Sequence, residues 1–138
     1  MIGIISADNL ILKYNTELCN DFSNLIYRTI GMIKKYGLET ESLNLNFKKI
    51  DNNIIESVAE NIAKYREYFE GFMLQKAIEE ILDIIAKANK YIDSVEPWKL
   101  FKEKEQNLKK LNIFIYTLVN IIRIVRNINK SGNARNSK

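Results

Sequence analysis

Apolar side chains recur every three or four residues along most of this chain, which is the spacing of an α-helix with one buried face. The first such segment runs from a candidate N-cap at Ser6 to Gly37, a residue that favours the end of a helix. Residues 38 to 50 show no sustained period and predict a connecting loop. Asp51 is the next candidate cap. The pattern therefore predicts one long helix and then a loop, and the periodic positions of that helix are Leu18, Phe22, Leu25, Thr29, Met32, Ile33 and Tyr36.

Three further segments repeat this spacing. A second helix is expected over residues 51 to 68, and the pattern breaks near Gly71, because glycine disfavours an uninterrupted helix. A third helix is expected over residues 73 to 92. Pro97 cannot continue that helix but suits the first position of a short one that follows. The last helix, over residues 106 to 128, is the most hydrophobic of the set.

Four or five helices, each with one apolar face and joined by short connections, predict an all-α protein built as an antiparallel helical bundle. The chain has 138 residues, of which 46% are hydrophobic and 28% are charged, and this is the profile of one globular domain. We expect that domain to occupy residues 1 to 128. Residues 129 to 138 carry no large apolar side chain and predict a disordered basic tail.

The composition also bears on the compartment. Cys19 is the only cysteine, so no disulfide can form within the chain and a cytoplasmic location is expected. The apolar start, residues 1 to 5, is too short for a signal peptide. The stretch from Leu111 to Val125 is interrupted by four polar residues, and we expect no membrane span.

Several kinds of enzyme chemistry have no residues to support them. The chain has no histidine, which excludes nucleophile pairs that use an imidazole base and metal sites with imidazole ligands. No glycine-rich phosphate loop is present. The acidic neighbours Glu79 and Glu80, and Glu103 and Glu105, carry no sign of the burial that a catalytic carboxylate needs. We therefore expect a binding domain without a catalytic residue, metal site or cofactor.

Positive charge gathers towards the C-terminal end. The formal net charge is +4, and no acidic residue follows Glu105, whereas seven basic residues do. A basic end is compatible with binding to a phosphate backbone, but it equally fits a solvated helix face. The charge distribution alone therefore does not distinguish a nucleic-acid-binding protein from one with a solvated basic surface.

Asn20, Asn24 and Arg28 are spaced four residues apart, so the predicted first helix places them in one stripe away from its apolar face. Amide and guanidinium groups offer several hydrogen bonds in a fixed plane and can pair with the edges of nucleobases. The pattern by itself fits a solvated face as well.

Trp98, the only tryptophan, directly follows the only proline. A tryptophan at this position can anchor the core, or it can serve as a platform on which an unpaired nucleobase stacks. The polar neighbours Glu96, Lys99 and Lys102 suit a partly exposed ring.

Two longer segments carry a resemblance to a known family. Residues 88 to 103 read AlaAsnLysTyrIleAspSerValGluProTrpLysLeuPheLysGlu, and residues 14 to 36 read TyrAsnThrGluLeuCysAsnAspPheSerAsnLeuIleTyrArgThrIleGlyMetIleLysLysTyr. The first resembles the AsnLysTyrIleAsp and ProTrp segment of methionyl-tRNA synthetases. The second resembles the TyrAsn, LeuAlaAsnAsp, GlyAsnLeu, ArgThr and MetIle pattern of the same family.

This resemblance implies an anticodon-binding domain of the class I synthetase type, an α-helical bundle that follows the catalytic domain. It implies that Trp98 stacks on an anticodon base and that Asn20, Asn24 and Arg28 approach the anticodon. The implied partners are methionine tRNA with its CAU anticodon and the catalytic domain of the same synthetase, with neither a membrane nor DNA. The parent enzyme would use ATP and methionine.

The departures from the family leave alternatives open. Both signature sequences of the class I active site are absent, so this chain alone is not expected to act as a ligase. It could be the anticodon-binding part of a larger synthetase or a tRNA-binding paralogue without a role in aminoacylation. A helical scaffold that binds proteins through its apolar last helix is the alternative from another functional class.

Overall fold

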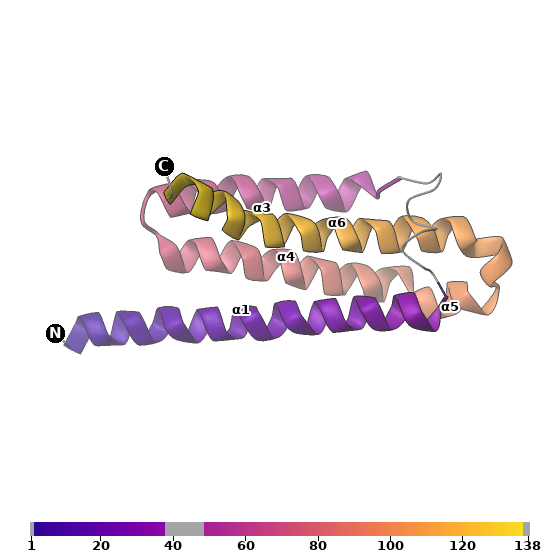
Figure 1. Ribbon diagram of the computed structural model, residues 1–138, viewed down its shortest axis with the longest axis horizontal. Helices are drawn as coiled ribbons and strands as arrows, with labels where there is room; N and C mark the ends of the chain where they lie inside the picture. Colours follow the sequence, from indigo (N-terminus) through magenta and orange to yellow (C-terminus); the bar gives the residue numbers. More distant parts are fainter. Residues whose placement is uncertain (1, 38–48, 137–138) are drawn as a thin grey trace.

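The protein is a bundle of long helices in the computed structural model, which describes residues 2–37 and 49–136, with side chains described for 12–37 and 49–128. This part of the chain contains helices and no strand, which confirms the predicted all-α class (Figure 1). The helices are α1 (Ile2–Lys35), α3 (Asn52–Glu70), α4 (Leu74–Val95), α5 (Pro97–Lys102) and α6 (Lys104–Asn136).

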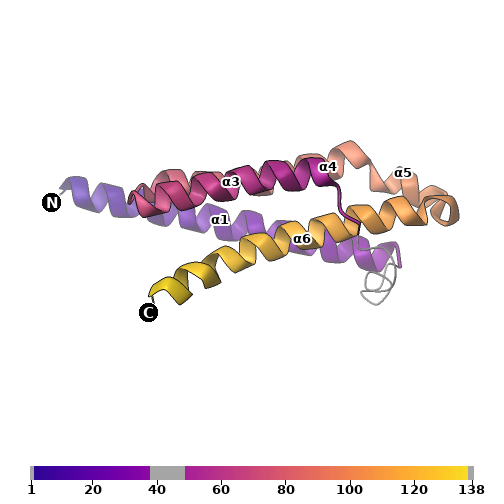
Figure 2. The ribbon, with the colours of Figure 1, turned by 90° about the horizontal axis from the view of Figure 1, so that it is seen from above.

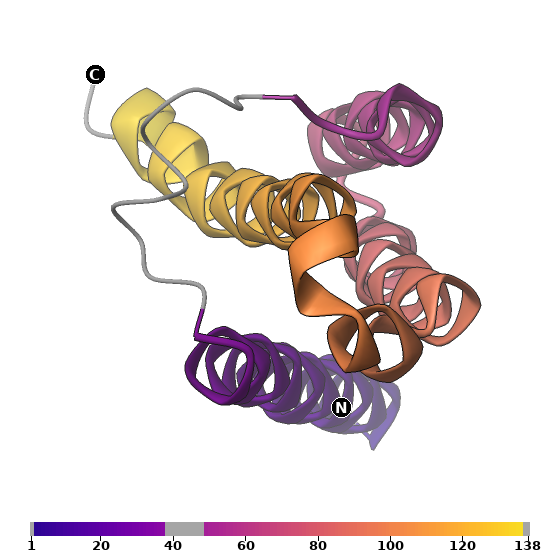
Figure 3. The same cartoon turned by 90° about the vertical axis from the view of Figure 1, so that its right-hand side faces the viewer.

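Successive long helices alternate in direction, as an antiparallel bundle requires (Figures 1 and 2). As a result α1 and α4, which pack side by side, run in the same direction. Gln75 of α4 donates a hydrogen bond to the hydroxyl of Tyr14 (3.3 Å), and Arg28 of α1 donates one to Asn89 (3.1 Å). Both pairs are separated by 61 residues, so the two helices keep one register over this length. Figure 3, an end view, shows α4 between α1 and α3, with α6 across from them.

Several predicted helix boundaries are confirmed. Gly37 adopts a φ of +64°, the left-handed region that ends a helix. The Asp51 side chain accepts a hydrogen bond from the backbone N–H of Asn53 and caps α3. Gly71 ends α3, and Pro97 begins α5.

Other boundaries differ from the predictions. Ser6 is not an N-cap, because α1 already begins at Ile2. Residues 38–48 of the predicted loop lie outside the described residues, and 49 and 50 are not helical. The helix α6 continues to Asn136, where composition predicts a disordered tail from residue 129. Extending an existing helix needs no new nucleation, so polar residues can prolong α6 without any apolar face to bury.

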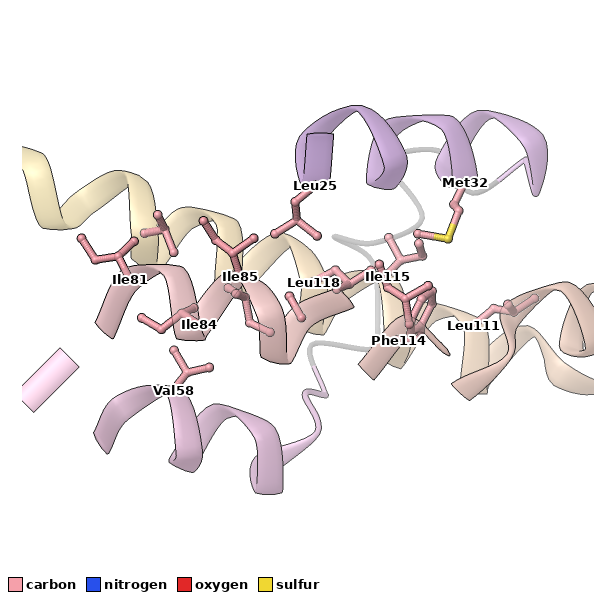
Figure 4. Packing of buried hydrophobic residues seen from close by; sticks show 14 of the residues in the cluster. Leu25, Met32, Val58, Ile81, Ile84, Ile85, Leu111, Phe114, Ile115 and Leu118 are labelled. Atoms are coloured by element: carbon pink, nitrogen blue, oxygen red, sulfur yellow. The ribbon is translucent and has the colours of Figure 1, made fainter. Parts of the chain in front are cut away.

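The core lies between the four long helices (Figure 4). Its centre comes from α6, where apolar positions at helical spacing are fully buried against α1, α3 and α4. Burying a leucine, isoleucine or phenylalanine side chain contributes about 1.5 to 3 kcal/mol each. The largest fully buried apolar side chains are Phe114, Leu25, Ile84, Ile85, Ile92, Leu111, Ile115, Leu118, Ile121 and Val58.

A polar network joins α3 to α4 beside this core. Asn61 is only 4% exposed, and its amide donates hydrogen bonds to Glu80 (3.2 Å) and Asp83 (2.9 Å). Lys87 in turn donates to the amide oxygen of Asn61 (2.6 Å). The buried amide is thus satisfied on both sides, as a buried polar group must be to avoid a large desolvation cost.

The segment Lys104–Ile128 of α6 is long and apolar enough to cross a membrane by length and composition, the only such segment among the described residues. The polar residues between Leu111 and Val125 therefore do not exclude a span by themselves, contrary to the sequence-based expectation. Half of the most apolar window is buried inside the protein. The buried face of α6 explains this apolar character as that of a core helix.

Candidate functional site

The three polar residues predicted to share a stripe all lie exposed on α1. No hydrogen bond engages the side-chain amide of Asn20 or Asn24 among the residues that the structure describes. Both amides therefore face solvent with their donors and acceptors available. The predicted stripe is present as a surface feature.

Arg28 is the member of the stripe that the fold holds in place. One terminal nitrogen, Nη1, donates to Oδ1 of Asn89 (3.1 Å), and the other, Nη2, donates to Oδ1 of Asp93 (3.0 Å). Both partners come from α4. The Arg28 side chain is 40% exposed and that of Asp93 is 66% exposed, so the ion pair lies at the surface. The two hydrogen bonds orient the guanidinium plane, and part of the side chain remains exposed to solvent.

Asn89 and Asp93 were not predicted as site residues. They lie four residues apart on α4 and therefore on one face of that helix. Asn89 also donates to the backbone carbonyl of Ile85 (3.2 Å), which fixes its amide so that the oxygen accepts from Arg28. The sequence shows the four-residue spacing of Asn89 and Asp93. It does not show that this face of α4 contacts Arg28 of α1.

The Arg28 region is connected to α5 through an aromatic pair. Burial raises the pKa of the Tyr36 phenol, and the positive charge of Arg28 opposes this with a smaller lowering effect. The Tyr36 ring packs on Phe101 of α5 with ring centroids 4.8 Å apart. The end of α1 and the short helix that carries Trp98 therefore belong to one end of the bundle, and Arg28 is joined to that end by Asp93, which precedes Trp98 by five residues.

Trp98 is exposed at this end and is not the core anchor that sequence pattern alone also allows. The residue is 44% exposed, whereas its neighbour Pro97 is buried. Glu96 adopts a left-handed conformation (φ 53°) between α4 and α5, and this turns the chain sharply. Pro97 then starts α5 with its fixed φ. The buried proline holds the helix start and leaves the indole partly in solvent.

Lysines surround the Trp98 end. Lys34 and Lys35 lie in the last turn of α1, and Lys99 and Lys102 in that of α5. Lys99 pairs with Glu96 (2.5 Å). The ammonium of Lys104 lies beside Gly37, where a Cβ would meet it at 3.1 Å. Cations at the C-terminal end of α1 are favoured by the helix dipole and are available to hold phosphates.

The four predicted site residues are not all brought together. Arg28 contacts α4 through Asn89 and Asp93, whereas Asn24 lies one turn and Asn20 two turns, about 12 Å, before Arg28 along the axis of α1. Asn20 lines an open surface with Leu12, Lys13, Thr16, Glu17 and Asp21, all from α1. Of the three residues in the predicted stripe, Asn20 therefore lies farthest along α1 from the end of the bundle that carries Trp98.

A different exposed surface lies at the opposite end, in the turn between α3 and α4 (Figure 1). Phe72 is 89% exposed and has a positive φ of 58°, which is rare for a residue other than glycine. Phe69, Met73 and Leu74 are also exposed there. We call these four residues the turn patch.

Comparison with known proteins agrees with the resemblance read from the motifs. Residues 44–131 match the model of the family described as the anticodon-binding domain of methionyl tRNA ligase. No solved structure matches the chain.

Curated relatives agree with the family match. The chain is 38% identical over 130 residues to a methionine–tRNA ligase of Ureaplasma parvum, covering 88% of this chain and 23% of that protein. It is 34% identical over 123 residues to the ligase of Clostridium acetobutylicum (89% and 19%) and 38% identical over 112 residues to that of Mycoplasma genitalium (75% and 21%). The chain spans about a fifth of the length of these relatives. By its family match and its helical fold, the chain belongs to the anticodon-binding domains of the methionyl-tRNA ligase family.

Proposed function

We propose that this chain recognises the CAU anticodon of methionine tRNA as the anticodon-binding part of a methionine–tRNA ligase. The observation that carries the proposal is the oriented Arg28 guanidinium, held by Asn89 and Asp93, at the same end of the bundle as the half-exposed Trp98. Sequence-specific recognition of RNA usually targets single-stranded loops, whose unstacked bases can reach aromatic and polar side chains. A stacking surface and a fixed hydrogen-bonding group at one end suit such a loop.

In this mechanism Trp98 and the polar residues have different roles. The exposed face of the indole stacks on one unpaired anticodon base, an interaction of about 1 to 3 kcal/mol that every base can make. The free amide of Asn24 and the solvent-exposed part of Arg28 hydrogen-bond to base edges and supply the sequence preference. Asn20 meets a more distant part of the loop.

Asp93 has a part in selectivity. Its carboxylate holds Arg28 and leaves this pair without net charge, so the guanidinium is less attractive to any passing phosphate. The lysines at the ends of α1 and α5 hold the backbone phosphates without reading the sequence. The site therefore separates positioning of the strand from reading of its bases.

The test is binding of a fluorescent RNA hairpin with a CAU loop, compared with a hairpin of equal length and charge whose anticodon is changed. Anisotropy titrations over a salt series separate the phosphate contribution, which weakens with salt, from the anticodon-dependent difference. We expect the difference to persist at high salt. Trp98→Ala should weaken binding of the CAU hairpin by about 5- to 150-fold, the equivalent of one lost base stack.

Phe72→Ala is the matched control, because it removes an exposed aromatic ring at the other end of the bundle. That variant should bind the CAU hairpin like the unaltered protein. Equal affinity for both hairpins, or no effect of Trp98→Ala, would contradict the proposed function.

The ligase itself would comprise further domains, which use ATP and methionine in the cytoplasm, and the turn patch suits contact with such a domain. Phe72 keeps a strained conformation while its ring makes little contact within this chain, which suggests that the ring is used against another surface. The patch lies at the end of the bundle where α1 begins, away from α5 (Figures 1 and 2). RNA and protein would then occupy opposite ends.

Docking can be tested with the part of the Ureaplasma parvum ligase that this chain does not match, produced separately. Calorimetric titration should detect binding to this chain and a loss of at least about tenfold for Phe72→Ser, since one buried aromatic side chain contributes a large share of such a contact. Trp98→Ala should leave this binding unchanged. The opposite pattern would mean that the patch is not the contact.

A further inference from the structure

A second exposed aromatic residue lies next to the proposed anticodon site. Tyr27 is 74% exposed, although it carries a large apolar ring. It follows Asn24 by three residues and precedes Arg28 by one, so its side chain is a surface neighbour of the Asn24 amide. A single exposed aromatic residue is common on protein surfaces, and Tyr27 needs further support.

That support comes from Gly31, one turn further along α1. Gly31 is exposed, and a Cβ added there would meet nothing within 4 Å. No close packing therefore requires glycine at this position, although glycine destabilises a helix interior relative to alanine. Side chains on a helix lean towards its N-terminus, so a side chain at 31 would lie over the turn that contains Tyr27 and Arg28. Glycine leaves the surface between the phenol ring and the guanidinium open.

The charge of this half of α1 suits a polyanion. No acidic residue occurs between Phe22 and Tyr36, whereas Arg28, Lys34 and Lys35 are basic. Tyr27, Gly31 and these cations lie on the part of α1 that runs towards α5 and Trp98. An open apolar ring beside free hydrogen-bonding groups and flanking lysines matches an unpaired nucleotide with its phosphate.

We propose that Tyr27 is a second base-stacking residue and that Gly31 keeps the space that its base occupies. This proposal rests on the proposed binding of an anticodon loop, and it adds a nucleotide site to it. About 14 Å of α1 separates Tyr27 from Tyr36, the residue on which α5 packs, so Tyr27 and Trp98 take different nucleotides of the same strand.

The experiment measures binding of the CAU hairpin by the full chain and by three variants. Tyr27→Ala should weaken binding by about 5- to 150-fold, whereas Tyr27→Phe, which keeps the stacking face, should change it by less than about twofold. Gly31→Gln should raise the melting temperature, because glutamine is the better helix former, and at the same time weaken binding by at least about threefold. Loss of affinity in a more stable protein cannot be a folding defect.

The outcomes separate this proposal from the one on which it rests. If Trp98→Ala loses affinity but Tyr27→Ala and Gly31→Gln bind like the unaltered protein, the second stacking site is wrong and anticodon binding stands. If the unaltered protein does not prefer the CAU hairpin, both proposals fail. If Tyr27→Phe weakens binding as much as Tyr27→Ala, the hydroxyl and not stacking is responsible, and the inference is overturned.

Discussion

Replacing Asp93 by asparagine removes one negative charge beside Arg28 and keeps the shape of the side chain. The carboxylate accepts from Nη2 of Arg28 at 3.0 Å, and an asparagine oxygen can still accept that hydrogen bond. The change therefore tests charge at the candidate site with little change in packing. We expect Asp93→Asn to lower the stability slightly, to raise the affinity for any RNA hairpin and to lower the preference for the CAU hairpin.

The effect on stability follows from exposure. The two side chains are 40% and 66% exposed, and ion pairs in such positions contribute about 0.2 to 1 kcal/mol. For a domain of this size, 1 kcal/mol corresponds to roughly 3 °C in the melting temperature. Asp93→Asn should therefore lower the melting temperature by no more than about 3 °C.

The effect on RNA binding follows from Coulomb's law. A carboxylate about 8 Å from a phosphate opposes binding by about 0.5 kcal/mol in a water-like medium and by about 2 kcal/mol near a protein surface. Because Asp93 is well exposed, we take the lower figure, which corresponds to about twofold tighter binding of any RNA hairpin at low salt. The Arg28 guanidinium keeps this hydrogen bond but loses the neutralising charge beside it, so it attracts phosphates of any sequence more strongly. The ratio of dissociation constants between the altered and the CAU hairpin should therefore fall.

Anisotropy titrations with both hairpins at two salt concentrations measure these effects. Asp83→Asn is the control, since Asp83 is also exposed on α4 and ion-paired, with Lys87, but lies ten residues nearer the start of the helix; the asparagine oxygen can still accept the hydrogen bond from Asn61. The control should leave the ratio of the two dissociation constants unchanged. The reasoning would be refuted if Asp93→Asn left both affinities and their ratio as they are, or if it increased the preference for CAU.

Three further predictions concern stability. Phe72→Gly should stabilise the protein by about 1 kcal/mol, because glycine adopts the positive φ of 58° without strain and removal of the exposed ring loses little burial. A lower melting temperature would contradict this prediction. Asn61→Ala should destabilise the protein by about 1 to 3 kcal/mol in urea unfolding, since Glu80, Asp83 and Lys87 lose a buried partner. An unchanged midpoint of urea unfolding would show that the network does not contribute to stability. Burial, the largest cause, raises the pKa of Tyr91 to about 12. The folded protein then keeps a proton that the unfolded chain loses above about pH 10, so its stability should fall from pH 10 to pH 12. This fall should be smaller in Tyr91→Phe by roughly 1 to 3 kcal/mol, and equal slopes in the two proteins would refute the assignment.

Much of the fold could be predicted from local sequence. Helix periodicity, the Asp51 cap, the glycine at 37 and the proline at 97 act through the backbone of a few neighbouring residues, and the structure confirms each of them. The predictions that were wrong concern the ends of the longest helices. Ser6 lies inside α1, and α6 extends beyond residue 128, because extension of a helix depends on the turn already formed as well as on composition.

The candidate site likewise has features that follow from local sequence and features that depend on the tertiary structure. The sequence by itself determined which residues carry polar and aromatic groups, the stripe of Asn20, Asn24 and Arg28, and the motifs that resemble the methionyl-tRNA ligase family. Only the tertiary structure decided that Arg28 is held by Asn89 and Asp93, and that Trp98 is half exposed while Pro97 is buried. Spacing along one helix follows from local geometry, whereas the partner of a helix face depends on the register in which α1 and α4 pack, between residues more than sixty positions apart.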